Sequence, residues 1–525
     1  MESNKHIAEY IRQLWKHDAI QDLTYNGVPV WWFFKRRLES GVFPFFIMSD
    51  LFKKKRSIII AKLLFSRKLI YFNELLKIKA LRRMKKKPAC PSNHPHSHGR
   101  ILFLLPSTAL ISRGTTPPTY SFDRVERLYQ EFEKQGDPPF LCVTDPFSNR
   151  FRFSLLKMPH VLYSFSDAFS QKKLRKDAQQ ISKKWKRIKE YLRSGNKEYF
   201  LRLEPLFDFF FSFEMVYLAL LHYETYKKII GDYGIEAVLV YGNGPVERAA
   251  IMAAHSLKIP SIGYLHGFGF SIQRWDFPPN HFILVNGILE KEAYIKNGAP
   301  RNNLPVIGPL FLFGEVVHAR LKKIIQNLSL SKKQPGKKRI LLLTSPVEKD
   351  GVMSSESYLL YLKQMIQKNL SGLDVEILLK PHPLENNTLA RYGDFAPFNV
   401  KQVPQHMDKY DFYTLLSHSD LILSAFSTAV IETIVITNVP LILLEDIYRE
   451  NLINQHPFFD CIPLAKGTEN FSGLIKKTLF DDKFKKSLIR KRRKIRKWYP
   501  LHTDPVINAV RSTREIIKNS NDQWQ

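Results

Sequence analysis

Short apolar segments that end in turn residues recur along this chain, and they restrict its fold more than any other feature. They are apolar throughout rather than alternating, which is typical of parallel strands buried on both faces. Helical stretches, notably 245–257 and 289–296, separate several of them. This alternation predicts a doubly wound α/β domain. The segments are 101–106, 140–145, 237–243, 260–267, 281–287 and 304–308.

A second alternation of the same kind follows a polar connector at residues 319–338. A chain of 525 residues is long enough for two or three domains. We therefore predict two Rossmann-like domains, 100–318 and 339–525, that face a cleft. Ligands of such sheets bind beyond the carboxyl ends of the strands. The second set has apolar segments at 339–346, 375–383, 400–404, 421–427 and 440–445, and helices over 358–370 and from Thr428.

Positive charge is concentrated in two parts of the chain, whose formal net charge is +31. Residues 51–100 hold fifteen Lys or Arg and one acid, and residues 483–497 hold ten and no acid. Such an excess attracts polyanions. We expect residues 1–99 to form a basic, aromatic-rich extension and linker. Its residues 51–87, with residues 483–499, suit an anionic membrane surface. The alternative is a solvated charged surface.

Targeting signals and metal sites are not indicated. No apolar segment is long enough to span a membrane as a helix, and the first residues lack the apolar region of a signal peptide. The cysteines, Cys90, Cys142 and Cys461, are too far apart to suggest a disulfide framework or a zinc site. We expect a cytoplasmic protein, peripheral on the inner face of the cell membrane.

The segment 375–379 leads directly into Lys380-Pro381-His382-Pro383. The two prolines stiffen this loop and stop the strand from continuing. A histidine held rigidly at a strand end can donate a hydrogen bond to a phosphate oxygen, and Lys380 adds positive charge. The alternative is a turn histidine without a ligand.

Two further segment ends carry hydroxyl groups. Ser424 and Ser427 lie in the turn before Thr428, which opens a helix. Exposed N–H groups at a helix N-terminus suit a phosphate, and Glu432, one turn in, suits ribose hydroxyls. The alternatives are ordinary N-caps and a glutamate that complements the helix dipole. The first segment of this domain ends in another hydroxyl pair, Thr344 and Ser345, which could also meet the donor phosphate.

The first domain offers candidates for an acceptor site. Residues 241–248 end one segment and open a helix, but Glu247 stands where a dinucleotide-binding loop would have its third glycine. Asn243 and Glu247 are candidates to hold an acceptor. The next segment ends in Tyr264-Leu265-His266-Gly267.

K-P-H-P after a strand, with S-x-x-S-T-x-x-x-E opening a helix about forty residues later, resembles the bacterial capsule and cell-wall polymerases. These are the polysialyltransferase-like, capsule-polysaccharide and CDP-glycerol glycerophosphotransferase-like enzymes of the GT-B fold. The resemblance covers about residues 236–445. It implies that His382, Ser427 and Thr428 bind the donor phosphate and that Glu432 binds the ribose.

His266-Gly267 is similar to the Gln/Trp-His-Gly element of the same families. The resemblance implies that His266 faces the cleft as the base for the acceptor hydroxyl, a role suited to histidine near neutral pH. The alternative is a buried histidine bonded to backbone. Leu265 replaces the usual Gln or Trp, and no threonine follows Gly267. These departures favour a sugar transferase over a glycerophosphate polymerase.

The predicted activity is an inverting transfer of sugar from a CMP-, CDP- or UDP-linked donor to a polysaccharide or lipid-linked acceptor, in capsule or lipopolysaccharide-type synthesis. No D-x-D metal motif occurs, so neither an obligatory metal nor another cofactor is expected. The alternatives are a glycerophosphotransferase-like polymer synthase, a sugar-nucleotide epimerase of related fold, and a basic nucleic-acid-binding protein. The last is disfavoured, because no RRM signature or zinc finger is found.

Overall fold

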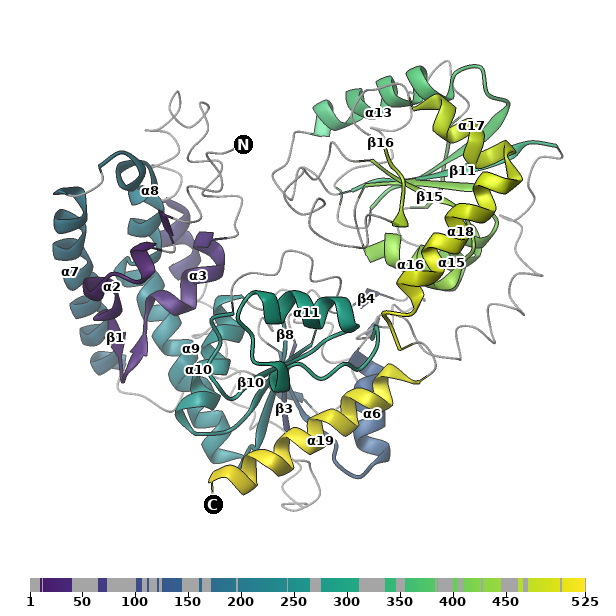
Figure 1. The fold of residues 1–525 in the computed structure, drawn as a ribbon. Helices are drawn as coiled ribbons and strands as arrows, with labels where there is room; N and C mark the ends of the chain where they lie inside the picture. Colours follow the sequence, from purple (N-terminus) through teal and green to yellow (C-terminus); the bar gives the residue numbers. More distant parts are fainter. Residues whose placement is uncertain are drawn as a thin grey trace.

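Two parallel six-stranded sheets form the framework of the computed structural model (Figure 1). They confirm the predicted α/β fold of two Rossmann-like domains. The structure describes residues 10–39 except 12, 65–72, 101–105, 111–112, 120–121, 125–143, 160–162, 171–194, 197–264 except 243, 275–310, 336–345, 355–382, 385, 400–404, 409–425, 428–444, 461–465, 471–500 and 503–524.

The first sheet has the strand order β10-β9-β8-β3-β6-β7. Alternate residues of β3 pack on opposite faces: Leu102 and Leu104 contribute to one core, and Ile101 and Phe103 to another. Burial on both faces explains why these strands are apolar throughout. The strands are β3 (Ile101–Leu105), β6 (Phe140–Val143), β7 (His160–Leu162), β8 (Ala237–Tyr241), β9 (Ser261–Tyr264) and β10 (His281–Leu284); the helices α6 (Val125–Lys134), α10 (Pro245–Ser256) and α11 (Ile288–Lys296) accompany them.

The prediction of a strand at residues 304–308 of this domain was wrong. Val306 forms only an isolated bridge with Val285. The N–H of Val285 donates to the Pro305 carbonyl and the N–H of Ile307 donates to the Val285 carbonyl, both at 3.0 Å. Pro305 has no N–H to extend a ladder, and Gly308 leaves the extended conformation with φ +97. A small hairpin of β4 (Ile111–Ser112) and β5 (Tyr120–Ser121) also lies in this domain.

The second sheet has the order β13-β12-β11-β14-β15-β16, and all its pairings are parallel. Leu341 and Leu343 of β11 pack on one face, and Ile340 and Leu342 on the other. Its strands are β11 (Lys338–Leu343), β12 (Val375–Lys380), β13 (Val400–Gln402), β14 (Leu421–Ser424), β15 (Leu441–Leu444) and β16 (Leu464–Ala465), with helices α13 (Ser355–Leu370), α15 (Lys409–Ser417), α16 (Thr428–Ile436), α17 (Ser472–Phe480) and α18 (Asp482–Arg496).

A block of three helices separates β7 from β8, and the apolar segments did not predict it. It consists of α7 (Gln171–Ser194), α8 (Lys197–Phe210) and α9 (Phe213–Asp232). Within the described ranges, no single helix has the length and apolar character needed to cross a bilayer. Phe200–Phe210 and Phe213–Asp232 meet those criteria only as a pair, with a bend of 51° between them.

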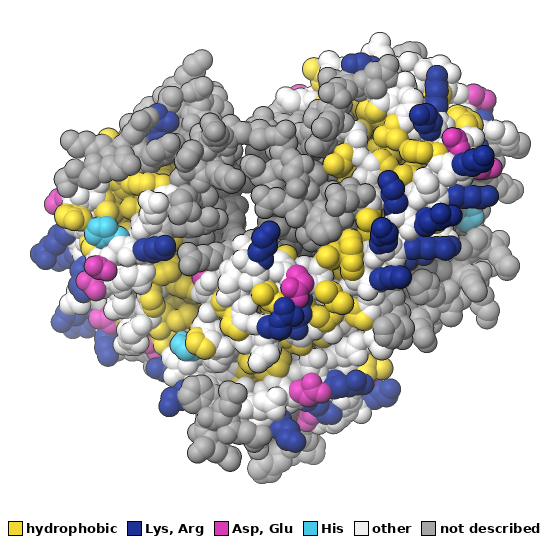
Figure 2. Space-filling model, viewed as in Figure 1, with side chains coloured by type: hydrophobic (Ala, Val, Ile, Leu, Met, Phe, Trp, Pro, Cys, Tyr) yellow, Lys and Arg dark blue, Asp and Glu magenta, His cyan; other side chains and the backbone are white. Residues whose placement is uncertain are grey.

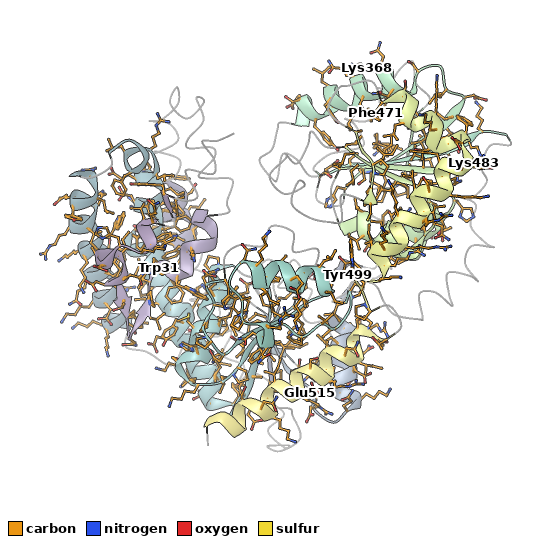
Figure 3. All side chains as sticks on the ribbon, in the orientation of Figure 1. Trp31, Lys368, Phe471, Lys483, Tyr499 and Glu515 are labelled. Atoms are coloured by element: carbon orange, nitrogen blue, oxygen red, sulfur yellow. The ribbon has the colours of Figure 1, made fainter. Side chains whose placement is uncertain are left out.

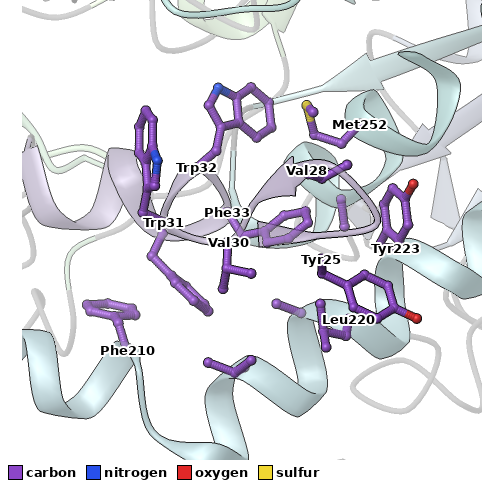
Figure 4. Packing of buried hydrophobic residues seen from close by; sticks show 14 of the residues in the cluster. Tyr25, Val28, Val30, Trp31, Trp32, Phe33, Phe210, Leu220, Tyr223 and Met252 are labelled. Carbon is purple, nitrogen blue, oxygen red and sulfur yellow. The ribbon is translucent and has the colours of Figure 1, made fainter. Parts of the chain in front are cut away.

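The aromatic cluster of the N-terminal segment is buried against this block. After α2 (Asp18–Gln21), a hairpin of β1 (Thr24–Tyr25) and β2 (Val28–Pro29) leads into α3 (Trp31–Glu39). Trp31, Trp32, Phe33 and Phe34 share one core with residues of α8, α9 and α10 (Figure 4). The aromatic part of the predicted extension therefore completes the first domain, while the predicted boundaries at 99 and 318 lie outside the described residues.

Buried charges fasten this segment to the first domain. Arg248 of α10 is 1% exposed, and it donates to the Trp32 carbonyl at 3.1 Å and to Asp276 at 3.2 Å. Its guanidinium lies 4.4 Å from the Trp32 ring centroid. Lys35 pairs with the same Asp276 carboxylate at 2.9 Å. Burial raises the pKa of Asp276, but Arg248 and Lys35 outweigh it, and the pKa falls below its ordinary value.

The last helix, α19 (Pro505–Trp524), returns from the second domain to the first. It runs beside α6 (Figure 1), and Val506, Ala509 and Val510 join the core of the first sheet. Asn508 donates to the Ile307 carbonyl at 2.9 Å. Residues 505–524 thus follow the second domain in sequence but pack on the first.

Candidate functional site

Three neighbouring strands of the second sheet end level with one another. Leu343, the last residue of β11, pairs with Lys380 of β12 on one side and with Ser424 of β14 on the other. Because the strands are parallel, the residues that follow them emerge at the same edge. The predicted loops that begin at Thr344, Pro381 and Ala425 are therefore brought together.

The Thr344 side chain holds the histidine loop in place. The backbone N–H of Thr344 donates to the Lys380 carbonyl at 3.1 Å. The Thr344 hydroxyl accepts a hydrogen bond from the backbone N–H of His382 at 2.9 Å. The same hydroxyl donates to the Glu385 carboxylate. Thr344 therefore positions His382 through the backbone. Sequence patterns did not predict this role of Glu385. The one feature that could have indicated it is that Glu385 is the first acidic residue after the K-P-H-P loop.

Lys380 contributes a buried positive charge beside this loop. Its side chain is 6% exposed, and its ammonium donates to the Pro381 carbonyl at 2.9 Å. The ammonium also lies 5.9 Å from the ring centroid of Phe412 in α15. Phe412 is a second residue that sequence patterns did not indicate, because it reaches the loop from a helix far along the chain.

The two serines of these strand ends differ in what they contact. Ser424 donates its hydroxyl to the Ala425 carbonyl at 2.6 Å, so it stabilises its own turn. Ser345 is fully buried, and its N–H donates to the Tyr358 hydroxyl at 3.1 Å. Its own hydroxyl has no hydrogen-bond partner within the part of the chain that the structure describes.

Helix α16 begins at this edge, with Thr428 as its first residue. Glu432, one turn further on, is 3% exposed. Ser427 and the side chain of Thr428 lie outside the described residues, so their predicted contacts with phosphate stay predictions. The helix begins at the fourth residue after the end of β14, the strand that pairs with β11.

The opposite end of α16 is capped by two arginines of the basic helix α18. Arg492 donates to the carbonyls of Thr433 at 2.9 Å and Thr437 at 3.3 Å, and Arg496 donates to that of Ile434 at 2.8 Å. Cations here complement the negative end of the helix dipole. Burial, with a smaller effect from Arg496, lowers the pKa of Arg492 to about 9. Because this pKa is still above neutral pH, the side chain stays charged there.

The outward face of α18 carries the remaining positive charge. Lys483, Lys486, Arg490 and Arg493 are exposed, and a row of basic side chains covers α18 in Figure 2. The predicted basic surface of 483–499 therefore has two parts. Arg492 and Arg496 stabilise α16, and only the outward residues are available to a partner.

The first sheet also has a level carboxyl edge. Tyr264, the last residue of β9, pairs with Tyr241 of β8 and with Leu284 of β10. Glu247 lies in the first turn of α10 and is 8% exposed. Its carboxylate folds back over the N-cap, with Oε2 2.6 Å from the point that a Cβ on Gly244 would occupy. Asn243 and His266 follow β8 and β9 but lie outside the described residues.

The residues that follow α18 contact this edge of the first domain. The N–H of Ile288 donates to the Trp498 carbonyl at 2.9 Å. A Cβ on Gly287 would lie 2.6 Å from that carbonyl oxygen and 2.6 Å from the Tyr499 ring. Tyr499 lies where the second domain meets the first (Figure 3). Its burial, reinforced by the Glu290 carboxylate, raises the pKa of Tyr499 well above its ordinary value.

No protein-family model and no curated protein matches the sequence. Among solved structures, the chain is similar to UDP-GlcNAc 2-epimerase from Neisseria meningitidis bound to UDP-GlcNAc (14% identity, 80% of this chain and 99% of that one, TM-score 0.45). It is also similar to the glycosyltransferase SnogD from Streptomyces nogalater (13%, 80% and 100%, TM-score 0.46) and to the calicheamicin glycosyltransferase CalG4 (11%, 80% and 99%, TM-score 0.44).

Proposed function

We propose that this chain is a glycosyltransferase that binds a nucleotide-activated sugar at the carboxyl edge of its second sheet. The observation that carries the proposal is the pairing of Leu343 with both Lys380 and Ser424. This register supports a site at the edge from which the histidine loop, Ser345 and the chain that leads to α16 emerge. The histidine loop and the N-terminus of α16 are suited to phosphate oxygens, whereas the Ser345 hydroxyl is buried.

In this proposal the second domain holds the donor. His382 donates to a phosphate oxygen, and the N-terminal N–H groups of α16, with Ser427 and Thr428, bind the same group. Glu432 accepts hydrogen bonds from the ribose hydroxyls. Lys380 supplies positive charge without direct contact, since its ammonium is buried against Pro381. Thr344 and Ser424 stabilise the two loops.

The first domain is proposed to hold the acceptor. Asn243 and Glu247 bind it, and His266 takes the proton of its hydroxyl. The acceptor oxygen then forms a bond to the anomeric carbon as the bond from that carbon to the nucleotide phosphate breaks, which inverts the configuration. The acceptor class proposed is a polysaccharide or lipid-linked glycan of the cell surface. The level ends of β8 and β9 support this placement, because residues 243 and 266 follow adjacent strands.

A two-stage experiment tests the proposal. Thermal shifts and calorimetric titrations with CMP, CDP, UDP and GDP, and with their sugars, should identify one nucleotide that stabilises the full-length chain. His382→Ala should weaken its binding about 10- to 100-fold, as expected for a charge-assisted hydrogen bond. If no nucleotide binds, or if the variant binds as tightly as the wild type, the donor site is wrong.

Turnover then separates the alternatives. Release of nucleotide that requires an added glycan acceptor supports transfer, and His266→Ala should abolish it while sparing donor binding. Conversion of the sugar nucleotide in the absence of acceptor would instead identify an epimerase. Polymer formation from CDP-glycerol would identify a glycerophosphotransferase. Salt-sensitive binding of RNA without nucleotide-sugar binding would identify a nucleic-acid-binding protein.

A further inference from the structure

The helix over residues 65–72 has the reverse of the usual polarity of a surface helix. Phe65, Leu69 and Phe72, spaced i, i+4 and i+7, share one face and are 69%, 48% and 61% exposed. A surface helix ordinarily turns such a face towards the core. Here these three large apolar side chains lie in solvent.

Contacts with α9 hold the helix in this orientation. Arg67 pairs with Glu214 at 3.2 Å. The Tyr71 ring, one turn further on, packs 6.0 Å from the rings of both Phe213 and Tyr217. Arg67 and Tyr71 lie on the face opposite Phe65, Leu69 and Phe72. The apolar face therefore points outward because charged and aromatic anchors occupy the inward face.

A basic surface adjoins this helix. Arg175 of α7 lies 6.0 Å from the ring centroid of Tyr217, the same ring that Tyr71 contacts. The buried residues of α7 form one face, and cations cover the other. Lys172, Lys173, Lys176, Lys183 and Lys184 are exposed there. The combination of exposed apolar side chains with adjacent cations is the chemistry that binds an anionic lipid surface.

We propose that the helix over residues 65–72 and the basic face of α7 form one membrane-docking surface. Phe65, Leu69 and Phe72 insert among the lipid acyl chains, and the lysines of α7 lie over the anionic headgroups. The surface takes eight of the residues 51–87 for which membrane contact is expected, those that the structure describes, and it adds α7, which the sequence did not single out. The inference does not depend on the reaction that the protein catalyses. By contrast, Phe480 is the one large exposed apolar side chain at α17 and α18 among the described residues, and α18 is expected to add only long-range attraction.

Vesicle co-sedimentation of the full-length protein tests the proposal. The wild type should bind vesicles that contain phosphatidylglycerol and should bind pure phosphatidylcholine weakly. The triple variant F65S/L69S/F72S should bind at least about tenfold more weakly to the anionic vesicles, because the apolar insertion is lost. Its anchors, Arg67 and Tyr71, are left intact. Equal binding by the triple variant and the wild type would overturn the proposal.

Two further variants serve as controls. One tests whether any loss of exposed apolar area weakens binding, and the other measures the part of the binding that charge attraction contributes. The control Leu360→Ser removes a leucine that is 57% exposed on α13, and it should bind vesicles as the wild type does. K172E/K176E should weaken binding to the anionic vesicles by about fivefold or more for each lysine, and the loss should shrink as salt is added. If the wild type binds no vesicles but is a dimer that F65S/L69S/F72S converts to a monomer, the surface binds a second copy of the chain and the membrane proposal is wrong.

Discussion

Arg492 donates to the carbonyl of Thr433 at 2.9 Å, and so the basic helix α18 caps the far end of the helix that starts at the candidate phosphate site. Both residues are buried. A sequence rich in Lys and Arg thus serves two purposes. Its inward arginines satisfy the last carbonyls of α16, and its outward cations remain at the surface.

Arg492→Met is expected to destabilise the protein by about 3 kcal/mol, because buried carbonyls at the end of α16 lose their donor. Urea unfolding measures this change in the free energy of unfolding. The matched control is Arg493→Met, one residue further on and exposed, for which a change below about 0.5 kcal/mol is expected. Equal effects of the two variants would show that Arg492 has no special role.

Thr344→Val is expected to weaken nucleotide binding about tenfold although Thr344 itself is not proposed to contact the nucleotide. Valine keeps the shape but removes the acceptor for the His382 N–H and the donor to Glu385, so the loop loses its fixed position. Calorimetric titration provides the measurement. Thr478→Val is the control, since that buried hydroxyl donates within its own helix α17, to the Leu474 carbonyl at 2.8 Å; it should leave nucleotide affinity unchanged.

Gly287→Ala is expected to destabilise the contact between the domains by about 1–3 kcal/mol, because the added Cβ overlaps Trp498 and Tyr499. The backbone at Gly287 is extended, with φ −162, so space rather than conformation requires glycine. Gly473→Ala, in α17 with no atom within 4 Å of the new Cβ, should instead stabilise by about 0.5–1 kcal/mol. Thermal unfolding measures the stability change of both variants, and the rate of proteolysis between the domains measures the loss of the domain contact in Gly287→Ala. A melting temperature of Gly287→Ala equal to that of the wild type would contradict the contact.

His281 makes the fold sensitive to mild acid. It is fully buried, its Nδ1 lies 2.9 Å from the Ser261 hydroxyl, and its ring stacks on Phe277. Burial, with a smaller effect from Arg248, lowers the pKa of His281 from 6.5 to about 3. Above pH 6.5 neither the folded nor the unfolded chain holds this proton. Between pH 6.5 and 3 only the unfolded chain binds it, so stability falls as pH falls.

The loss due to His281 is about 2 kcal/mol at pH 5 relative to neutral pH. His281→Asn, which keeps a polar atom near the position of Nδ1, should remove this part of the pH dependence. Denaturant unfolding at about pH 7 and pH 5 measures it for both proteins. If the two proteins lose the same stability over this interval, His281 is not the group that titrates.

Sequence patterns were sufficient to predict most strands of both sheets, because a strand buried on two faces must be apolar at every position, as Ile101–Leu105 and Lys338–Leu343 largely are. They also indicated Lys380, His382, Ser424 and Glu432, since turn residues after a strand mark the edge where ligands of such sheets bind. They did not indicate α7, α8 or α9, whose packing partners include the distant aromatic residues 31–34.

The sequence by itself determined the alternation of strands and helices, the two concentrations of positive charge and the polar residues at the strand ends. Only the tertiary structure decided which of these groups meet. The register that aligns Leu343 with Lys380 and Ser424 joins residues far apart in the chain. The division of α18 into inward and outward cations, and the outward apolar face of residues 65–72, depend on which side of each helix its neighbours cover. Local patterns record only the composition of a face, whereas packing determines what lies against it.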